Sequence, residues 1–158
     1  MKNLLEELQE TLYTDIPLTK HLAITVDSYD DERLLLKAPL AQNINHKGTA
    51  FAGSLNAVVT LAGWGLLWLV LKEMGVRAVI VIQDSASNYL LPVKSDFSAC
   101  CYRPDSGQIA RMKQMLLMKG RARLELKAEI VADLKVAVSF QGRYVVSLYP
   151  SEGEESIS

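Results

Sequence analysis

Several residue types that often define a protein's chemistry are scarce in this sequence. Its 158 residues include only two cysteines, Cys100 and Cys101, which are adjacent. Neighbours on a strand point to opposite faces of a sheet, so a disulfide between these two would be strained. No Cys-x-x-Cys pair and no Cys/His spacing predicts zinc, and nothing in the sequence calls for a bound metal or cofactor. We therefore expect two buried, free thiols in a reducing compartment, the cytoplasm.

An excess of either charge is also lacking. Lys and Arg together number 17 and Asp and Glu 18, for a net charge of −1. This balance does not support nucleic-acid binding, and an anionic partner would have to meet a local basic patch. The length predicts a single domain over residues 1–150, followed by an acidic, disordered tail at 151–158.

One uncharged run, residues 48–71, reaches the length of a membrane span, about 20 apolar residues. Polar residues and glycines interrupt it, however, and its first six residues read as a loop. We expect a core helix over residues 54–74, enclosed on nearly all sides, and no membrane span. The N-terminal segment is charged within its first turns, so it predicts a helix over residues 2–14 and not a signal peptide.

The remaining pattern is mainly that of strands. Two short strands are expected within residues 21–40, separated by a turn at 28–32, and others at 79–92 and 96–103. A helix at 104–119 and two long strands, 120–133 and 134–149, complete the chain. About six strands and one dominant helix predict an α+β fold, in which a curved antiparallel sheet wraps around the helix.

The stretch "NINHKGTAFAGSL", residues 43–55, is unusually polar and glycine-rich for a loop that only leads into a helix. It resembles the loop-to-helix signature of hotdog-fold proteins, in which an asparagine or histidine precedes a glycine pair or an Ala-Gly, here Ala52-Gly53. "SNYLLPV" at 87–93 and "KGRARLEL" at 119–126 resemble the strands that follow in these proteins, and the likeness spans about residues 15–149.

More narrowly, "NHKGTAFAGSLNAVVTLAGWGLL" resembles thioesterases often found as the C-terminal half of longer proteins. In those proteins the N-terminal half is an acetyltransferase-like domain of the GNAT type. The resemblance implies a hotdog fold with an extra N-terminal helix. It also implies an acyl-thioester hydrolase that acts on acyl-CoA or acyl-carrier-protein thioesters in fatty-acid or acyl metabolism.

A helix start suits this chemistry because it exposes unpaired N–H groups at the positive end of a dipole. The backbone at Ala52, Gly53 and Ser54 could stabilise the oxyanion formed when water attacks the thioester, and Gly53 would admit the substrate carbonyl. Asn45 or His46 could hold the water or the thioester.

The general base is the feature in which this sequence departs from the family pattern. Many hotdog thioesterases place an Asp or Glu on the central helix, seven or eight residues after the second glycine of the signature. Here those positions are Thr60 and Leu61, neither of which is a carboxylate. This departure favours the alternative of a hotdog protein that binds acyl-CoA or acyl carrier protein without hydrolysing it.

Two residues could replace the missing carboxylate. Asp84 ends the apolar run "VIVIQD", and burial against the helix would make it a candidate base; otherwise it is a solvated acid at a strand end. His46 is the competitor, as a base or as a hydrogen-bond anchor only.

A polar stripe on the helix, formed by Asn56, Thr60 and Gly63, could bind the thioester or its water, with Gly63 leaving room. The plainer interpretation is that these polar groups bond to the neighbouring backbone.

Positive charge gathers in "KGRAR", where Lys119, Gly120, Arg121 and Arg123 could meet the phosphates of coenzyme A or an acidic carrier protein. The alternative is an ordinary charged strand face. Because exposed sheet edges invite pairing and proteins of this resemblance form at least dimers, we expect a homodimer or dimer of dimers with the acyl site between subunits.

Overall fold

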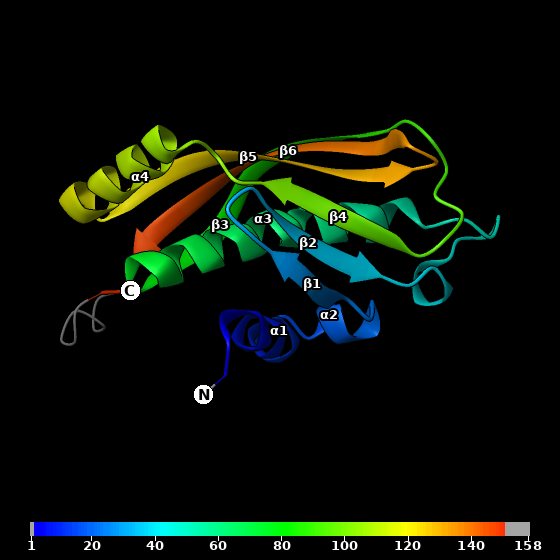
Figure 1. Ribbon diagram of the computed structural model, residues 1–158, viewed down its shortest axis with the longest axis horizontal. Coiled ribbons are helices and arrows are strands. Elements are labelled where there is room, and N and C mark those ends of the chain that lie inside the picture. Colours follow the sequence, from blue (N-terminus) through cyan, green and yellow to red (C-terminus); the bar gives the residue numbers. More distant parts are fainter. Residues whose placement is uncertain (1, 151–158) are drawn as a thin grey trace.

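The computed structural model of the protein describes residues 2–150, so the predicted acidic tail lies outside the described residues. Six strands and one long helix appear, as predicted (Figure 1). The strands are β1 (Thr25–Tyr29), β2 (Arg33–Ala38), β3 (Ala78–Tyr89), β4 (Phe97–Tyr102), β5 (Arg121–Ala132) and β6 (Lys135–Leu148). The helices are α1 (Leu4–Asp15), α2 (Leu18–His21), α3 (Ala52–Met74) and α4 (Ser106–Lys119), with a 3-10 turn η1 (Ala41–Asn43).

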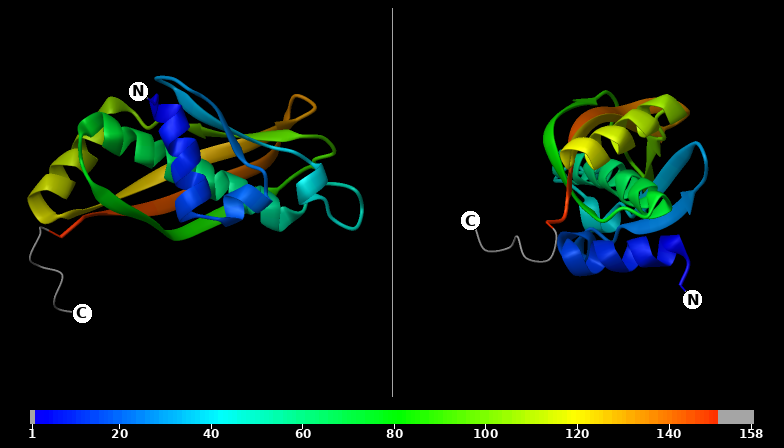
Figure 2. Two further views of the ribbon diagram at one scale, coloured as in Figure 1. Left: turned by 90° about the horizontal axis from the view of Figure 1, so that it is seen from below. Right: turned by 90° about the vertical axis from the view of Figure 1, so that its left-hand side faces the viewer.

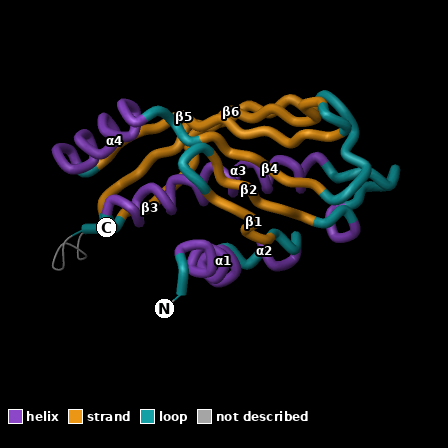
Figure 3. Tube along the Cα trace, viewed as in Figure 1, coloured by secondary structure: helices purple, strands orange, loops and turns teal. Residues whose placement is uncertain are grey.

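The six strands form one antiparallel sheet in the order β1-β2-β4-β5-β6-β3. The sheet curves around α3, and α1 lies across the side of α3 that the sheet leaves open (Figure 2). Figure 3 shows the same wrapping with the strands and helices separated by colour. Strands β1 and β3 are the two edges, so β3 has one side that no strand within residues 2–150 pairs with.

The predicted alternation of β5 is confirmed. Its even-numbered residues from Ala122 to Ile130 are buried, and the odd-numbered residues Arg121, Arg123, Glu125 and Lys127 are exposed. The turn to β6 contains Asp133 and Leu134, both with positive φ (51° and 64°). Positive φ at both central residues is the geometry of a tight hairpin turn whose twist matches that of its strands.

Helix α3 carries apolar residues on nearly all of its faces, because the rest of the molecule buries it on nearly all sides. Thirteen of its residues are buried, among them Val58, Ala62, Leu66 and Leu69. It is long and apolar enough to cross a membrane, yet 72% of its most apolar window is buried inside the molecule, as expected of a core helix. It ends at Gly75, whose φ of 68° is the left-handed cap predicted there.

Helix α1 contributes Leu8 and Leu12, both fully buried, to the core. It begins with a capping box in which Asn3 and Glu6 satisfy each other's backbone N–H groups. The two cysteines of β4 are free and buried, as predicted. Burial raises the pKa of the Cys101 thiol, so it stays protonated and inert.

Candidate active site

The polar junction before α3 is a tight turn held by the side chain of Asn45. Its Oδ1 accepts from the N–H of Lys47 at 2.9 Å and of Thr49 at 3.1 Å. Its Nδ2 donates to Thr49 Oγ1 at 2.9 Å. These bonds use most of the amide's hydrogen-bonding capacity. Asn45 therefore shapes the loop, and its predicted hold on a water or thioester stays a prediction.

Asn43, the first residue of the polar stretch, anchors this loop, although the sequence predicted no specific role for it. It is 2% exposed, and its Nδ2 donates to the carbonyls of Leu22 at 2.9 Å and Pro39 at 2.8 Å. The backbone carbonyl of Asn43 accepts from the N–H of Phe51 at 2.7 Å. This clamp fixes the residue at which α3 begins.

The start of α3 is open. Phe51 is the N-cap residue, in extended conformation, and it makes no side-chain capping bond. Ala52 and Gly53 are exposed and Ser54 is buried. The first turn of the helix therefore presents backbone N–H groups that no side chain caps, as the predicted oxyanion site requires.

The space beside Gly53 is shared with an aromatic ring. A Cβ at this position would collide with the ring of Phe51, whose side chain is 55% exposed. Gly53 thus lets Phe51 lie across the helix start, and a substrate carbonyl would have to approach beside this ring or displace it. Sequence reasoning did not identify Phe51, since one phenylalanine in a loop gives no signal of its own.

A hollow of about 250 Å³ opens next to this helix start. Asn45, Ala50, Ala52 and Leu55 line one side, and the segment 89–93 after β3 lines the other. The segment is held by the N–H groups of Leu90 and Leu91, which donate to the carbonyl of Ala137. The signature loop and "SNYLLPV" therefore lie together at the start of α3.

The polar stripe on α3 faces β3 and β6. Ser87 donates its hydroxyl hydrogen to Asn56 Oδ1 at 2.9 Å. Tyr144 of β6 donates to the carbonyl of Thr60 at 2.6 Å. Asn56 and Thr60 are both partly buried, so the stripe bonds to neighbouring strands and keeps some exposure.

The expectation that Gly63 leaves room for substrate is wrong in this chain. A Cβ at Gly63 would collide with the Tyr144 hydroxyl, so that phenol already fills the room. Burial raises the pKa of Tyr144, which keeps it a neutral donor to Thr60.

Of the two interpretations of Asp84, burial against the helix is wrong and the exposed acid is found. Asp84 follows an irregularity in β3 between Ile82 and Asp84, and it pairs with Arg143 of β6. Its side chain is 55% exposed and lies 3.7 Å from Arg143 Nη1. Arg143 is one of the exposed residues that alternate with the buried face of β6, so Asp84 points away from α3.

His46 is exposed at the tip of the Asn45 turn, close in sequence to the helix start. It lines none of the hollows described for this chain. The second histidine, His21, is exposed at the end of α2.

The predicted basic residues lie at the junction of α4 and β5. Lys119, Arg121 and Arg123, with Arg111, line a groove of about 670 Å³. Arg123 donates from Nε to Gln83 Oε1 at 2.9 Å, which links it to β3. Gly120 has a φ of 73° and caps the end of α4, so its presence is explained by backbone conformation. Within residues 2–150 no three His, Cys, Asp or Glu side chains gather as metal ligands would.

The fold and the open helix start together define the class: this is a hotdog-fold protein of the thioesterase type. The model of the family described as "Putative thioesterase (yiiD_Cterm)" matches residues 5–148, and the chain belongs to this family. The sequence-based expectation of a hydrolase acting on thioester bonds agrees with this membership.

Solved structures agree with this assignment. The chain is 35% identical to a putative thioesterase from Shewanella oneidensis, with a TM-score of 0.83 over 94% of this chain and 100% of that one. It is 31% identical to a protein of unknown function from Chlorobaculum tepidum TLS, with a TM-score of 0.88 over 91% and 94% of the two chains. A probable thioesterase from Pseudomonas aeruginosa, 19% identical, shares the fold with a TM-score of 0.78 over 91% and 95%.

Proposed function

We propose that the protein hydrolyses acyl thioesters of coenzyme A or of acyl carrier protein, as part of acyl or fatty-acid metabolism in the cytoplasm. The observation that carries this proposal is the uncapped start of α3 beside a hollow lined by the signature loop and residues 89–93. Backbone N–H groups aimed at a developing oxyanion are an effective way to lower the barrier to acyl transfer.

In this proposal the N–H groups of Gly53 and Ser54 bind the thioester oxygen. Asn56 lies one helical turn further on, and its Oδ1 accepts from Ser87. That bond orients the amide so that its NH₂ group is directed to another acceptor, either the attacking water or the thioester carbonyl. Thr60 follows on the same face and could position the water, although it is a poor base without a partner.

His46 is the proposed general base, because the helix carboxylate of related thioesterases is replaced by Thr60 and Leu61. An imidazole titrates near neutral pH and can take a proton from water. His46 is exposed on its own chain, so it would act after a substrate or a second subunit covers it.

A second subunit is part of the proposal. Strand β3 is a 12-residue edge of the sheet, and Val79, Val81 and Ile82 are 42%, 51% and 37% exposed on it. A long edge with exposed apolar side chains favours pairing with another strand. We propose that β3 pairs with β3 of a second copy, as a homodimer or within a dimer of dimers.

The experiment is thiol release from a panel of acyl-CoA thioesters of increasing chain length and from acylated carrier protein. Asn56→Ala should lower kcat/KM by about 10²-fold, as expected when a preorganised donor is lost. Gln141→Ala is the matched control, because Gln141 is an exposed amide side chain of β6 that bonds to Glu125 and does not lie on β3. Binding of acyl-CoA without thiol release would support the alternative, a non-hydrolytic acyl-thioester-binding protein.

His46 is tested separately by His46→Ala and His46→Gln. Loss of the base should lower kcat by about 10²- to 10⁴-fold and remove the acidic limb of the pH–rate profile. If His46 is only an anchor, His46→Gln should retain turnover with the wild-type pH profile.

A further inference from the structure

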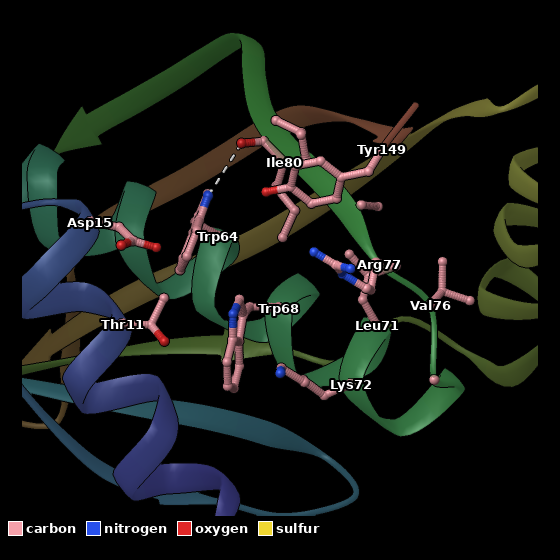
Figure 4. A pocket seen from close by; sticks show the side chains of 13 residues that line it. Thr11, Asp15, Trp64, Trp68, Leu71, Lys72, Val76, Arg77, Ile80 and Tyr149 are labelled. Carbon is pink, nitrogen blue, oxygen red and sulfur yellow. Dashed lines mark hydrogen bonds between the residues drawn. The ribbon is translucent and has the colours of Figure 1, made fainter. Parts of the chain in front are cut away.

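A second hollow, of about 460 Å³, lies between α1, the C-terminal half of α3 and the start of β3 (Figure 4). Its volume is within the range of small-molecule sites. The charged and large aromatic residues that line it are Asp15, Trp64, Trp68, Lys72, Arg77 and Tyr149. Neither the signature loop nor the polar stripe reaches it, so it is separate from the site described above.

Aromatic rings dominate this hollow. The sequence contains two tryptophans, and both line it, each partly exposed. Trp64 donates from Nε1 to the carbonyl of Ile80 at 3.2 Å, which fixes the plane of its indole. A fixed, partly exposed indole offers a flat face on which a planar base can stack.

Two cations accompany the rings. Lys72 Nζ lies 5.0 Å from the centre of the Trp68 ring, and the Arg77 guanidinium lies 5.5 Å from the centre of the Tyr149 ring. In Figure 4 the Arg77 and Tyr149 side chains lie together, across the hollow from Asp15. Lysine and arginine at the rim of an aromatic hollow suit a ligand that carries phosphate groups beside its ring.

Neighbouring carboxylates do not cancel these charges. Glu7 Oε2 is 3.7 Å from Lys72 Nζ, longer than a hydrogen bond, and the two side chains are 40% and 49% exposed. An exposed pair of this kind is weak, so Lys72 can turn to a phosphate. Asp15 is the one acid among the lining residues, and as an acceptor it suits the exocyclic amine of a base.

We propose that this hollow binds an adenine nucleotide, with the base against the tryptophans and the phosphates on Lys72 and Arg77. For the proposed hydrolase this identifies the carrier as coenzyme A, whose nucleotide end would occupy the hollow. That conclusion about the carrier rests on the proposed function, whereas nucleotide binding itself does not.

The hollow lies some distance along α3 from the helix start of its own chain. The α3 residues that line it run from Trp64 to Lys72, which at about 1.5 Å per residue is roughly 17–29 Å beyond Gly53. The proposed pairing of β3 with its copy would bring a second helix start, that of the partner subunit, to the hollow. Antiparallel pairing about the middle of β3 places residue 78 of one chain opposite residue 89 of the other. The hollow of one subunit then lies beside the α3 start of its partner.

The test is titration of the protein with adenosine 3′,5′-bisphosphate, which has no thioester to hydrolyse. Calorimetry gives the affinity, and intrinsic fluorescence locates the site because both tryptophans lie in this hollow. We expect saturable quenching, about tenfold weaker binding in each of Lys72→Ala and Arg77→Ala, and weaker binding of adenosine without phosphate.

The matched control is the double variant Arg121→Ala/Arg123→Ala, which removes two cations from the α4–β5 groove and should leave the affinity unchanged. Loss of nucleotide binding in this variant, with Lys72→Ala and Arg77→Ala unaffected, would overturn the assignment and place the nucleotide in that groove. Absence of any saturable binding would also overturn it. Tryptophan fluorescence that changes with protein concentration but not with nucleotide would overturn the assignment as well. Such a result would mean that the partner subunit fills the hollow.

The two proposals fail separately. Thiol release from acyl-CoA without nucleotide binding would support the proposed hydrolase activity and contradict the proposed nucleotide site. Nucleotide binding without thiol release from any thioester would support the nucleotide site and contradict the hydrolase activity. Circular dichroism of each variant confirms that a lost signal reflects the site and not unfolding.

Discussion

At the residue scale, Gly63 and Tyr144 form a pair in which the absence of one side chain admits the other. Gly63→Ala would drive a methyl group into the Tyr144 phenol and disturb its bond to the Thr60 carbonyl. Overpacking of this kind costs about 1–3 kcal/mol. Urea unfolding should show that loss, and a smaller one when Gly63→Ala is made in a Tyr144→Phe background. Strictly additive losses would show that the two residues are not coupled.

The sequence context of Asp84 suggested a candidate general base, but its exposed position does not support that role. It pairs with Arg143 at 3.7 Å, and the side chains are 55% and 49% exposed. Exposed pairs contribute from nothing to about 1 kcal/mol. Asp84→Asn should therefore change the unfolding free energy by less than about 0.5 kcal/mol and leave thiol release within about twofold of wild type. A loss of turnover comparable to that of His46→Ala would restore Asp84 as the base.

The residues that sequence reasoning identified at the helix start are those whose type alone carries information. Gly53 and Asn45 stand out because a glycine and an asparagine at a loop-to-helix junction have few structural uses. Phe51, Ser87 and Tyr144 were missed because their roles arise from contacts between segments far apart in the chain. The position of Asp84 was left open because the irregularity in β3 decides which face it occupies, and no residue type in that strand signals it.

At the element scale, Gly120 shows how a backbone requirement can resemble a binding motif. It sits within "KGRAR" between basic residues, yet its φ of 73° ends α4, and a Cβ there would meet no atom within 4 Å. Gly120→Ala should therefore destabilise the protein by about 1 kcal/mol through backbone strain alone. Gly120→Asn should cost less, because asparagine tolerates this conformation. Loss of carrier affinity in Gly120→Ala at unchanged stability would instead indicate a contact with the substrate.

The long elements were predictable because each has a strong and regular pattern. The apolar run that ends at Gly75 predicted α3, and the alternation of polar and apolar residues over 120–133 predicted β5. The short elements α2 and η1 were not predicted, since three or four residues do not establish a period. The start of α3 was placed at Ser54 and lies at Ala52, because the clamp formed by Asn43 and Phe51 sets it and no capping side chain marks it.

At the scale of the whole molecule, the two hollows and the free edge of β3 give a single geometric expectation. One hollow lies at the start of α3 and the other along its C-terminal half, and β3 runs between them. Pairing of β3 with a second copy would bring the aromatic hollow of each chain to the helix start of the other and complete two equivalent sites. In a monomer the proposed carrier would instead have to extend along α3, from the hollow to the helix start of the same chain.

Light scattering coupled to size-exclusion chromatography should therefore show a dimer or a dimer of dimers. Val81→Lys/Ile82→Lys places charge on both faces of the β3 edge, which should shift the protein toward monomer and lower thiol release from acyl-CoA by at least about tenfold. Leu134→Lys is the matched control, because Leu134 is 99% exposed and lies in the β5–β6 turn, not on β3. A β3 variant that is monomeric, folded and fully active would show that one chain holds a complete site. The carrier would then reach from the hollow to the helix start of the same chain, and the division of the site between subunits would be wrong.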